Sequence, residues 1–301
     1  MAQERMVYIN GEIVPESEGK VSFRDQGFVT GDAVFDATRT FGGVIFKLQE
    51  HLDRLYDSLK YMRLYPRISQ QQMAELTMQV LAANQPLLGP DDDYWVIQRI
   101  SRGVPTGGGE YKPTVIIECN PLPFAARARY YRDGLSVVIP SIRRTPPECM
   151  SPRVKVHNYI NLLLADQEAK AQNPDAFSIL LDINGNIAEG LGSNFFIVKD
   201  GVIITPKEQY VLVGISRETV IELAQGLNIE VQEADIDLYD VYTADEAFVT
   251  STSFCLCSVS SVNGSTIGDG SVPGPVTDRI QTAYSDLVGI DIVKQYLKRL
   301  D

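Results

Sequence analysis

The 301-residue chain has few of the side chains from which metal centres are built. It contains two histidines, His51 and His157, which excludes a histidine-rich metal site. None of its four cysteines has the paired spacing of a zinc site, so we expect no resident metal. Cys255 and Cys257 fall on one face of a predicted strand, and we interpret them as buried apolar residues rather than as a redox pair.

The chain also lacks a long apolar run and a surplus of positive charge. No run of about 18 apolar residues occurs, and the first residues, MAQERMVYINGE, lack the apolar core of a signal peptide. Acidic residues outnumber basic ones by 39 to 27, which gives a net charge of -12. A nucleic-acid or anionic-membrane partner would need a basic face, so we expect neither. A reducing cytoplasm with free thiols is the simplest setting.

What is present is typical of a globular protein with two domains. A length of 301 residues, at about 150 residues per domain, predicts two, and 44% hydrophobic residues supply their cores. The stretch from Asn120 to Asp133 has two prolines and three arginines, which indicates a connection. We therefore predict a small domain over residues 1–121, an interdomain loop over 122–134 and a large domain over 135–301.

Hydrophobic periodicity predicts a mixture of helices and strands in both halves. In the first half, strands are expected at 6–14 with a turn at Asn10-Gly11, at 33–48 with a turn at Gly42-Gly43, and at 94–100 and 114–119, and helices at 48–62 and 69–85. In the second half, strands are expected at 135–140, 178–182, 194–198, 247–250 and 256–259, and helices at 159–171, 217–227 and 277–287. The glycine-rich segment 103–112 predicts a mobile loop near a substrate.

A reactive amine is the first candidate for chemistry. Lys155 lies in the apolar-flanked segment RVKVHNYINLL, where lost hydration would favour a neutral amine suited to Schiff-base formation. Tyr159 follows it by four residues, near a helix start. Glu189, in NIAEGLGSNFF, has glycines nearby and could face a ring nitrogen. Taken singly, each residue is better explained without chemistry, as a surface lysine, a half-buried core tyrosine and an exposed turn glutamate.

An anion site is the second candidate. Gly214, Ile215 and Ser216 lead into a predicted helix, whose first N–H groups together with a serine hydroxyl can bind a phosphate. The alternative is that Ser216 only caps the helix. Thr252 ends a predicted strand in VTSTSF and could donate to the same phosphate. Together these segments supply an amine, a ring-nitrogen partner and a phosphate cradle.

These motifs, in this order and spacing, resemble the class IV aminotransferases, the fold-type IV enzymes that use pyridoxal phosphate (PLP). The matching segments are VKVHNY, IAEGLGSNFFIVKDGVIITP, LVGISRETV, TADEAFVTSTS and IGDGSVPGPVTDRI, with GDAVFDATRTF and FKLQEHLDRLYDS in the first half. Val213 stands where the family usually has proline. The resemblance implies an α+β fold with a small α/β N-terminal domain and a larger β-barrel-like α/β C-terminal domain.

The resemblance also implies a role for individual residues. Lys155 would hold PLP as a Schiff base and then carry the proton, and Phe35 would line the substrate pocket. The expected cofactor-binding residues are Arg54, Lys155, Tyr159, Glu189, Leu212, Ile215, Ser216 and Thr252. In this set Glu189 pairs with the pyridine nitrogen, Tyr159 binds the phenolic oxygen, and Leu212 packs against the ring. Arg54, Ser216, Thr252 and the Ile215 backbone bind the phosphate.

The substrate carboxylate would need a cationic partner. We expect Arg39, Arg99 or Arg102 to bind it, with Arg127 and Arg129 as further candidates and surface salt bridges as the alternative for each. Thr30 and Asp36 depart from the branched-chain pattern, which usually has tyrosine and glutamate there. We therefore predict branched-chain-like transamination of L-amino acids first, with R-amine or D-amino-acid transamination close behind.

Two further readings stay open at this point. An aminodeoxychorismate lyase would need the same lysine and phosphate cradle but no second keto acid. A non-catalytic PLP-binding homologue would be suggested by loss of Lys155 or Glu189, and both are present. The expected partners are a small-molecule amino donor and a 2-keto acid acceptor, and the resemblance implies a homodimer or a higher homo-oligomer.

Overall fold

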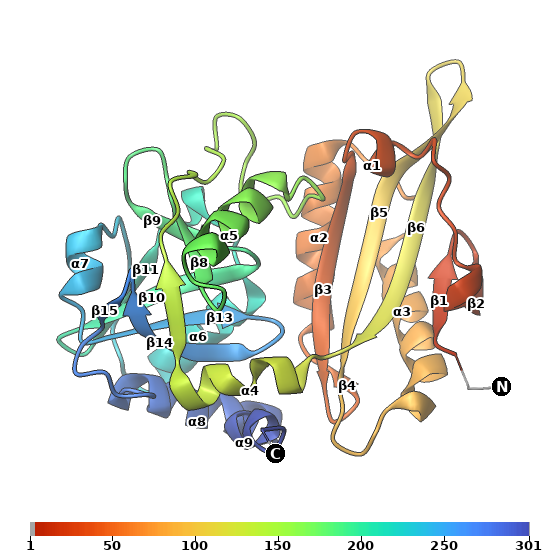
Figure 1. Ribbon diagram of the computed structural model, residues 1–301. Coiled ribbons are helices and arrows are strands. Elements are labelled where there is room, and N and C mark those ends of the chain that lie inside the picture. The colour runs from red at the N-terminus through yellow and green to blue at the C-terminus, as the bar shows by residue number, and fades with distance from the viewer. Residues whose placement is uncertain (1–3, 301) are drawn as a thin grey trace. The chain divides into compact units, whose positions relative to one another are not determined.

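The computed structural model describes residues 4–300 and divides into two compact units (Figure 1). The first unit runs to Leu122 and also takes in Val154–Asn158. The second unit comprises Pro123–Arg153 and the chain from Tyr159 onward. The lysine segment therefore belongs to the first unit, although it lies far from the rest of that unit in the sequence. The domain bounds that we predicted, 1–121 and 135–301 with a loop between them, stay a prediction.

The first unit is built on a six-stranded sheet in the order β2-β1-β6-β5-β3-β4. All of the strand pairs in this sheet are antiparallel, and the predicted turns at Asn10-Gly11 and Gly42-Gly43 are confirmed. The strands are β1 (Met6–Ile9), β2 (Glu12–Pro15), β3 (Ala33–Phe41), β4 (Val44–Ile45), β5 (Tyr94–Gly107) and β6 (Glu110–Pro121).

The α-helices among the described residues of this unit are α1 (Gln26–Val29), α2 (Leu48–Met62) and α3 (Gln70–Asn84). The predicted leucine stripe of α2 is confirmed, because Leu52, Leu55 and Leu59 are buried. Ser69 starts α3 with a capping box, in which its hydroxyl accepts from the Gln72 amide and the Gln72 side chain accepts from the Ser69 amide. The two long helices therefore begin and end close to where the periodicity places them.

The glycine-rich segment 103–112 is not the loop that we expected. β5 and β6 continue through it as a hairpin, with a register shift near Val104 and a turn at Gly108-Gly109 (Figure 1). Both turn glycines have positive φ. Glycine permits this tight reversal because it lacks a Cβ atom, so the segment extends the sheet instead of forming a separate loop.

The second unit contains a closed, barrel-like sheet, as we predicted. The order is β12-β11-β10-β13-β14-β7-β8-β9, and an additional β10–β9 pairing closes the ring. The strands are β7 (Leu135–Val138), β8 (Phe177–Leu181), β9 (Ile187–Gly190), β10 (Ser193–Lys199), β11 (Val202–Pro206), β12 (Val231–Ala234), β13 (Glu246–Ser251), β14 (Cys255–Val262) and β15 (Ser265–Thr266). β9, which the sequence did not predict, lies between β8 and β10 along the chain and pairs with both.

The helices of the second unit are α4 (Phe124–Asp133), α5 (Ile160–Gln172), α6 (Ile215–Gly226), α7 (Leu238–Tyr242), α8 (Pro275–Val288) and α9 (Ile292–Leu297). Most of the segment interpreted as an interdomain loop, 122–134, is thus the helix α4. Its Tyr131 ring stacks on Tyr296 of α9, with centroids 4.8 Å apart. The two prolines lie before the helix, where they do not interrupt it.

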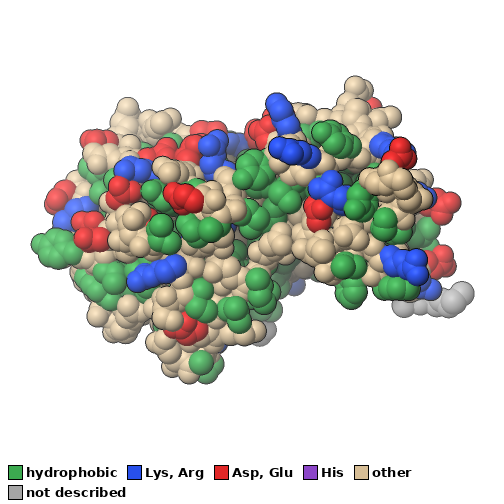
Figure 2. All heavy atoms as spheres, turned by 90° about the horizontal axis from the view of Figure 1, so that it is seen from above, with side chains coloured by type: hydrophobic (Ala, Val, Ile, Leu, Met, Phe, Trp, Pro, Cys, Tyr) green, Lys and Arg blue, Asp and Glu red, His purple; other side chains and the backbone are tan. Residues whose placement is uncertain are grey.

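The distribution of charged side chains on the surface is consistent with the expectation that no basic face exists. On the face drawn in Figure 2, acidic and basic side chains alternate with hydrophobic ones, and the basic ones form no continuous field. Within residues 4–300, no helix is long and apolar enough to cross a membrane. Cys255 and Cys257 are both buried, as expected, and burial raises the pKa of the Cys257 thiol.

The β5–β6 hairpin allows a matched test of backbone strain. Gly103 has φ +82°, and an added Cβ would lie 1.7 Å from the Lys112 carbonyl oxygen. Gly108 has φ +61° with nothing within 4 Å of such an atom. We expect Gly103→Ala to lower the free energy of unfolding by about 2–4 kcal/mol, and Gly108→Ala by about 1 kcal/mol. Equal losses in urea unfolding would contradict this account.

Candidate active site

Lys155 is fixed through its backbone, although it lies in no regular element. The Phe35 amide donates to the Lys155 carbonyl at 3.0 Å, and the His157 amide donates to the Ala33 carbonyl at 2.9 Å. These bonds, with a bridge between Val34 and Val156, attach the lysine segment to the edge of β3. The Lys155 amide also donates to Ser58 Oγ on α2, at 3.2 Å. Two separate elements therefore position the lysine.

The amine of Lys155 lies over an aromatic ring. Its Nζ is 4.5 Å from the centroid of Phe35, and the guanidinium of Arg99 is 5.4 Å from the same centroid. His157 contacts this ring edge-on, with centroids 5.3 Å apart. Phe35, predicted to line the substrate pocket, thus brings a lysine, an arginine and a histidine together.

Arg54 forms a buried cluster with two residues of its own unit. Its Nε and Nη2 donate to the two carboxylate oxygens of Asp36, each at 2.8 Å, and His51 Nδ1 lies 2.7 Å from Asp36 Oδ1. Burial alone would raise the pKa of Asp36, but Arg54 and His51 outweigh it and hold that pKa well below its usual range. Burial lowers the pKa of His51, so its imidazole is neutral near pH 7.

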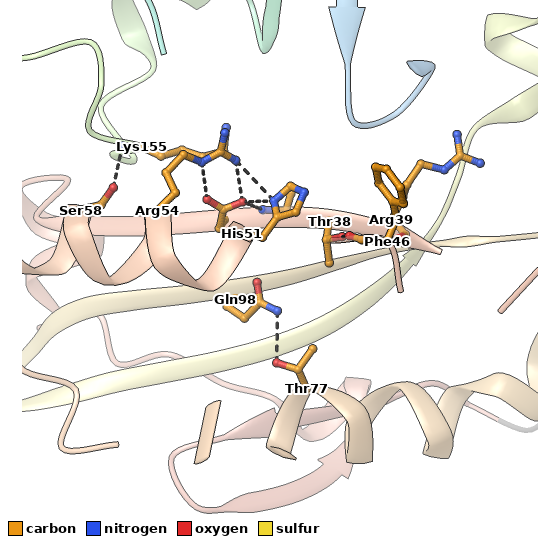
Figure 3. Close-up of polar contacts among 11 residues, drawn as sticks. Thr38, Arg39, Phe46, His51, Arg54, Ser58, Thr77, Gln98 and Lys155 are labelled. Atoms are coloured by element: carbon orange, nitrogen blue, oxygen red, sulfur yellow. Dashed lines mark hydrogen bonds and ion pairs between the residues drawn. The ribbon is translucent and has the colours of Figure 1, made fainter. Parts of the chain in front are cut away.

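One side of α2 carries the residues that organise this region. His51, Arg54 and Ser58 are spaced by three and four, which places them on one face of the helix. Figure 3 shows them in sequence along α2, with the backbone bond from Lys155 to Ser58 and the fork from Arg54. A single rigid helix therefore holds both the predicted phosphate-binding arginine and the backbone of the predicted catalytic lysine.

Glu189 is on β9, in the second unit, and is only 4% exposed. Its Oε1 accepts from Arg144 Nε at 2.8 Å, and its Oε2 accepts from the Leu212 amide at 2.9 Å. The expectation of an exposed turn glutamate is thus excluded. A carboxylate buried with a guanidinium partner is an anion held in one orientation.

The anion-binding segment is joined to Glu189 through Leu212. The Leu212 carbonyl accepts from Asn194 Nδ2 at 2.8 Å, two residues before Gly214. Gly214 is the N-cap of α6, and an added Cβ there would lie 2.2 Å from Asn194 Oδ1. Ser216 is therefore inside the first turn, and the alternative that it caps the helix is wrong. The first N–H groups of α6 have no carbonyl acceptor within the helix, as an anion site requires.

The remaining predicted cofactor residues lie in the second unit as well. Thr252 directly follows β13 and is half-buried, as are Leu212 and Ile215. Tyr159 is the N-cap residue of α5 and packs against a cluster of Leu162, Ala165 and Leu180. The ring of Tyr159 is therefore anchored by apolar contacts.

The candidate arginines differ in the partners that their guanidinium groups already have. Arg39 is buried, donates to the Thr40 carbonyl and stacks on Phe41. Arg102 donates to Asp32 and to the carbonyls of Met62 and Arg63 at the end of α2. In Arg99, by contrast, Nε alone makes a side-chain hydrogen bond among residues 4–300, to Glu118 at 2.7 Å, and the guanidinium lies over Phe35. Arg127 lies over Phe254, and Arg129 pairs with the exposed Asp175.

Sequence reasoning missed several residues of this arrangement. His51 could have been found, because it precedes Arg54 by three residues on a predicted helix. Ser58 could have been found in the same way. Arg144 and Asn194 carry no such signal, since only the fold of the second unit brings them near Glu189 and Leu212.

His157 provides a test by pH. Burial, followed by the charge of Arg99, lowers the pKa of His157 to about 4. As the pH falls below about 6.5, the unfolded chain therefore takes up the proton first, and stability is lost down to about pH 4. We expect the apo-protein to lose about 2 kcal/mol more than its His157→Gln variant between pH 7 and pH 5 in urea unfolding. Equal losses would show that His157 titrates normally.

Comparison with known proteins adds independent findings. The profile of the amino-transferase class IV family matches residues 33–262. A Methanocaldococcus jannaschii protein, provisionally named a branched-chain-amino-acid aminotransferase, is 36% identical over 286 residues, which cover 93% of this chain and 96% of that protein. The branched-chain-amino-acid aminotransferase of Escherichia coli K12 is 33% identical over 93% of this chain and 92% of its own length.

Solved structures agree with these relatives. The crystal structure of the E. coli branched-chain amino acid aminotransferase superposes with a TM-score of 0.86 at 32% identity, over 95% of each chain. A T.th. branched-chain amino acid aminotransferase complexed with N-(5'-phosphopyridoxyl)-L-glutamate gives a TM-score of 0.85 at 27% identity, over 98% of each chain. With these matches along most of its length, the chain belongs to the class IV aminotransferases.

Proposed function

We propose that this protein is a PLP-dependent transaminase that moves the amino group of a branched-chain-like L-amino acid to a 2-keto acid. The observation that carries the proposal is the shared ring of Phe35, over which both the Lys155 amine and the Arg99 guanidinium lie. An amine for the chemistry and a cation for a carboxylate, both held on one ring, suit a substrate that is itself an α-amino acid.

The residues present fit PLP in their donors. The first turn of α6, Ser216, Thr252 and Arg54 suit a phosphate, and the buried Glu189 suits a protonated pyridine nitrogen. Gly214 allows α6 to begin beside Asn194, because an added Cβ there would lie 2.2 Å from Asn194 Oδ1. Tyr159 would hold the phenolic oxygen, and Leu212 and Ile215 would border the ring. We propose that these residues act on one cofactor molecule.

In this proposal PLP supplies an electron sink for the bond that breaks at the α-carbon of the substrate. Lys155 Nζ would hold the cofactor and, as a free amine, would move the α-proton of the substrate. Glu189 would keep the proton on the pyridine nitrogen, and Arg144 orients Glu189. Ser58 and β3 fix the Lys155 backbone, so that only the flexible side chain travels during the proton transfer.

Removal of the amine tests the function. We expect purified, reconstituted protein to show a PLP absorbance band at the violet end of the spectrum that shifts when an amine donor is added. Lys155→Ala should remove the covalently bound band and lower transamination by several orders of magnitude. Lys170→Ala, in an exposed pair with Asp166, serves as the control and should change neither. Full turnover in Lys155→Ala would refute the proposal.

Arg99 is our choice among the arginines for the substrate carboxylate. We expect Arg99→Gln to raise the KM for L-leucine about 10- to 100-fold, because it removes a charged hydrogen bond, and to leave the affinity for PLP unchanged. Arg129→Gln, which removes only an exposed ion pair, is the matched control. An unaltered KM for L-leucine in Arg99→Gln would assign the carboxylate to a different group.

The donor panel also separates the other activities. L-leucine, D-alanine and R-1-phenylethylamine distinguish L-amino-acid, D-amino-acid and R-amine transamination. A lyase of the aminodeoxychorismate type would turn over without a keto-acid acceptor, and a non-catalytic PLP-binding homologue would bind the cofactor without turnover. Arg102, the candidate that resembles an arginine of the D-amino-acid and R-amine enzymes, already donates to Asp32 and to the Met62 carbonyl. This favours L-amino-acid transamination.

We also propose that the protein acts as a homodimer or higher homo-oligomer in the cytoplasm. The α5 residues Ile160, Leu163 and Leu164 are exposed along one side of the helix, and Phe23 and Phe28 are exposed in the first unit. Monomeric proteins rarely leave such apolar groups together at the surface, so these favour self-association. The four cysteines are free thiols, which suits a reducing compartment.

A further inference from the structure

The cluster around Arg54 contains more than a phosphate-binding residue requires. Asp36 is fully buried on β3 and occupies the Nε and Nη2 side of the Arg54 guanidinium with both of its oxygens. An exposed arginine would serve as a phosphate ligand without such a partner. Burying a carboxylate is costly, so its place beside Arg54 calls for an account of what it does there.

The geometry points to Asp36 and His51 as positioning residues for Arg54, and this inference rests on the proposed function. Asp36 receives N–H groups from both Nε and Nη2 of the guanidinium, one on each of its carboxylate oxygens. His51, 2% exposed, braces Asp36 through its Nδ1 at 2.7 Å. The Asp36 fork therefore holds the planar guanidinium in one rotation about its stem.

The charges of the cluster support this assignment. Asp36 is an anion, Arg54 a cation, and His51 is neutral because of its burial. The charges of Asp36 and Arg54 cancel. The cluster therefore attracts a phosphate through the direction of its N–H groups more than through a net positive charge. Orientation of Arg54 then decides affinity, and a residue that sets this orientation must influence phosphate binding without touching the phosphate.

The consequence is specific to the phosphate of the cofactor. Loss of the Asp36 fork would release Arg54 to other rotamers and weaken the binding of PLP, whereas pyridoxal, which has no phosphate, would bind as before. A merely structural role of Asp36 would instead weaken both ligands equally or reduce the folded fraction. The ratio of the two dissociation constants therefore separates positioning from general damage.

The experiment measures the binding of PLP and of pyridoxal to apo-protein by absorbance titration, for wild type, Asp36→Asn, His51→Gln, Arg54→Gln and the double variant Asp36→Asn/Arg54→Gln. We expect Asp36→Asn to weaken PLP about 10- to 100-fold and pyridoxal hardly at all. His51→Gln should show a smaller change of the same kind. Because Asp36 acts through Arg54, the double variant should bind PLP no more weakly than Arg54→Gln alone.

Controls and outcomes are distinguishable. Asp53→Asn, an exposed aspartate on the same helix that bonds Gln49 and Gln70, should leave both constants unchanged. Asp36→Glu keeps the charge and should restore part of the PLP affinity that Asp36→Asn loses. Equal effects on PLP and pyridoxal, or additive losses in the double variant, would overturn the inference. A wild type that binds neither ligand would instead overturn the proposed function.

Discussion

The attachment of the Lys155 segment to the edge of β3 is the constraint on which the site depends. Two backbone hydrogen bonds join Lys155 and His157 to β3, and Ser58 of α2 accepts the Lys155 amide. Because β3 also carries Phe35 and Asp36 on its opposite faces, one strand sets the ring below the amine and the carboxylate behind Arg54. Without this attachment, the Lys155 amine would have no fixed position relative to Phe35 and Asp36.

Periodicity and composition predicted the helices and strands that bury regularly spaced hydrophobic residues. The leucines of α2 and the hydrophobic patterns of β3, β5 and β6 identify these elements directly in the sequence. β9 escaped notice because four buried residues beside glycines resemble a turn. α4 was mistaken for a loop because two prolines precede it and it contains three arginines, although its buried face, including Tyr131, packs on α9. Tertiary contacts, not local pattern, determine both elements.

In the candidate site as well, some residues could be predicted from the sequence and others could not. Lys155, Glu189 and the segment 212–216 could be proposed from the sequence because each lies in a motif with its own chemistry. Their supports could not, except for His51 and Ser58, which share a helix face with Arg54. Arg144 precedes Glu189 by 45 residues, and only the barrel of the second unit brings its guanidinium to 2.8 Å from that carboxylate. Supporting residues are contributed by topology, which spacing does not reveal.

Both units contain a buried carboxylate–arginine pair, and the roles of the two charged groups are exchanged between the units. In each, a buried carboxylate accepts from an arginine and from a neutral N–H group: Asp36 from Arg54 and His51, and Glu189 from Arg144 and the Leu212 amide. At Asp36 the arginine is the working group and the carboxylate holds it, whereas at Glu189 the carboxylate works and the arginine holds it. Buried ion pairs add little net stability, but they fix direction strongly. Such pairs are therefore expected where a reaction needs orientation, and here each stands beside a group that the proposed chemistry uses.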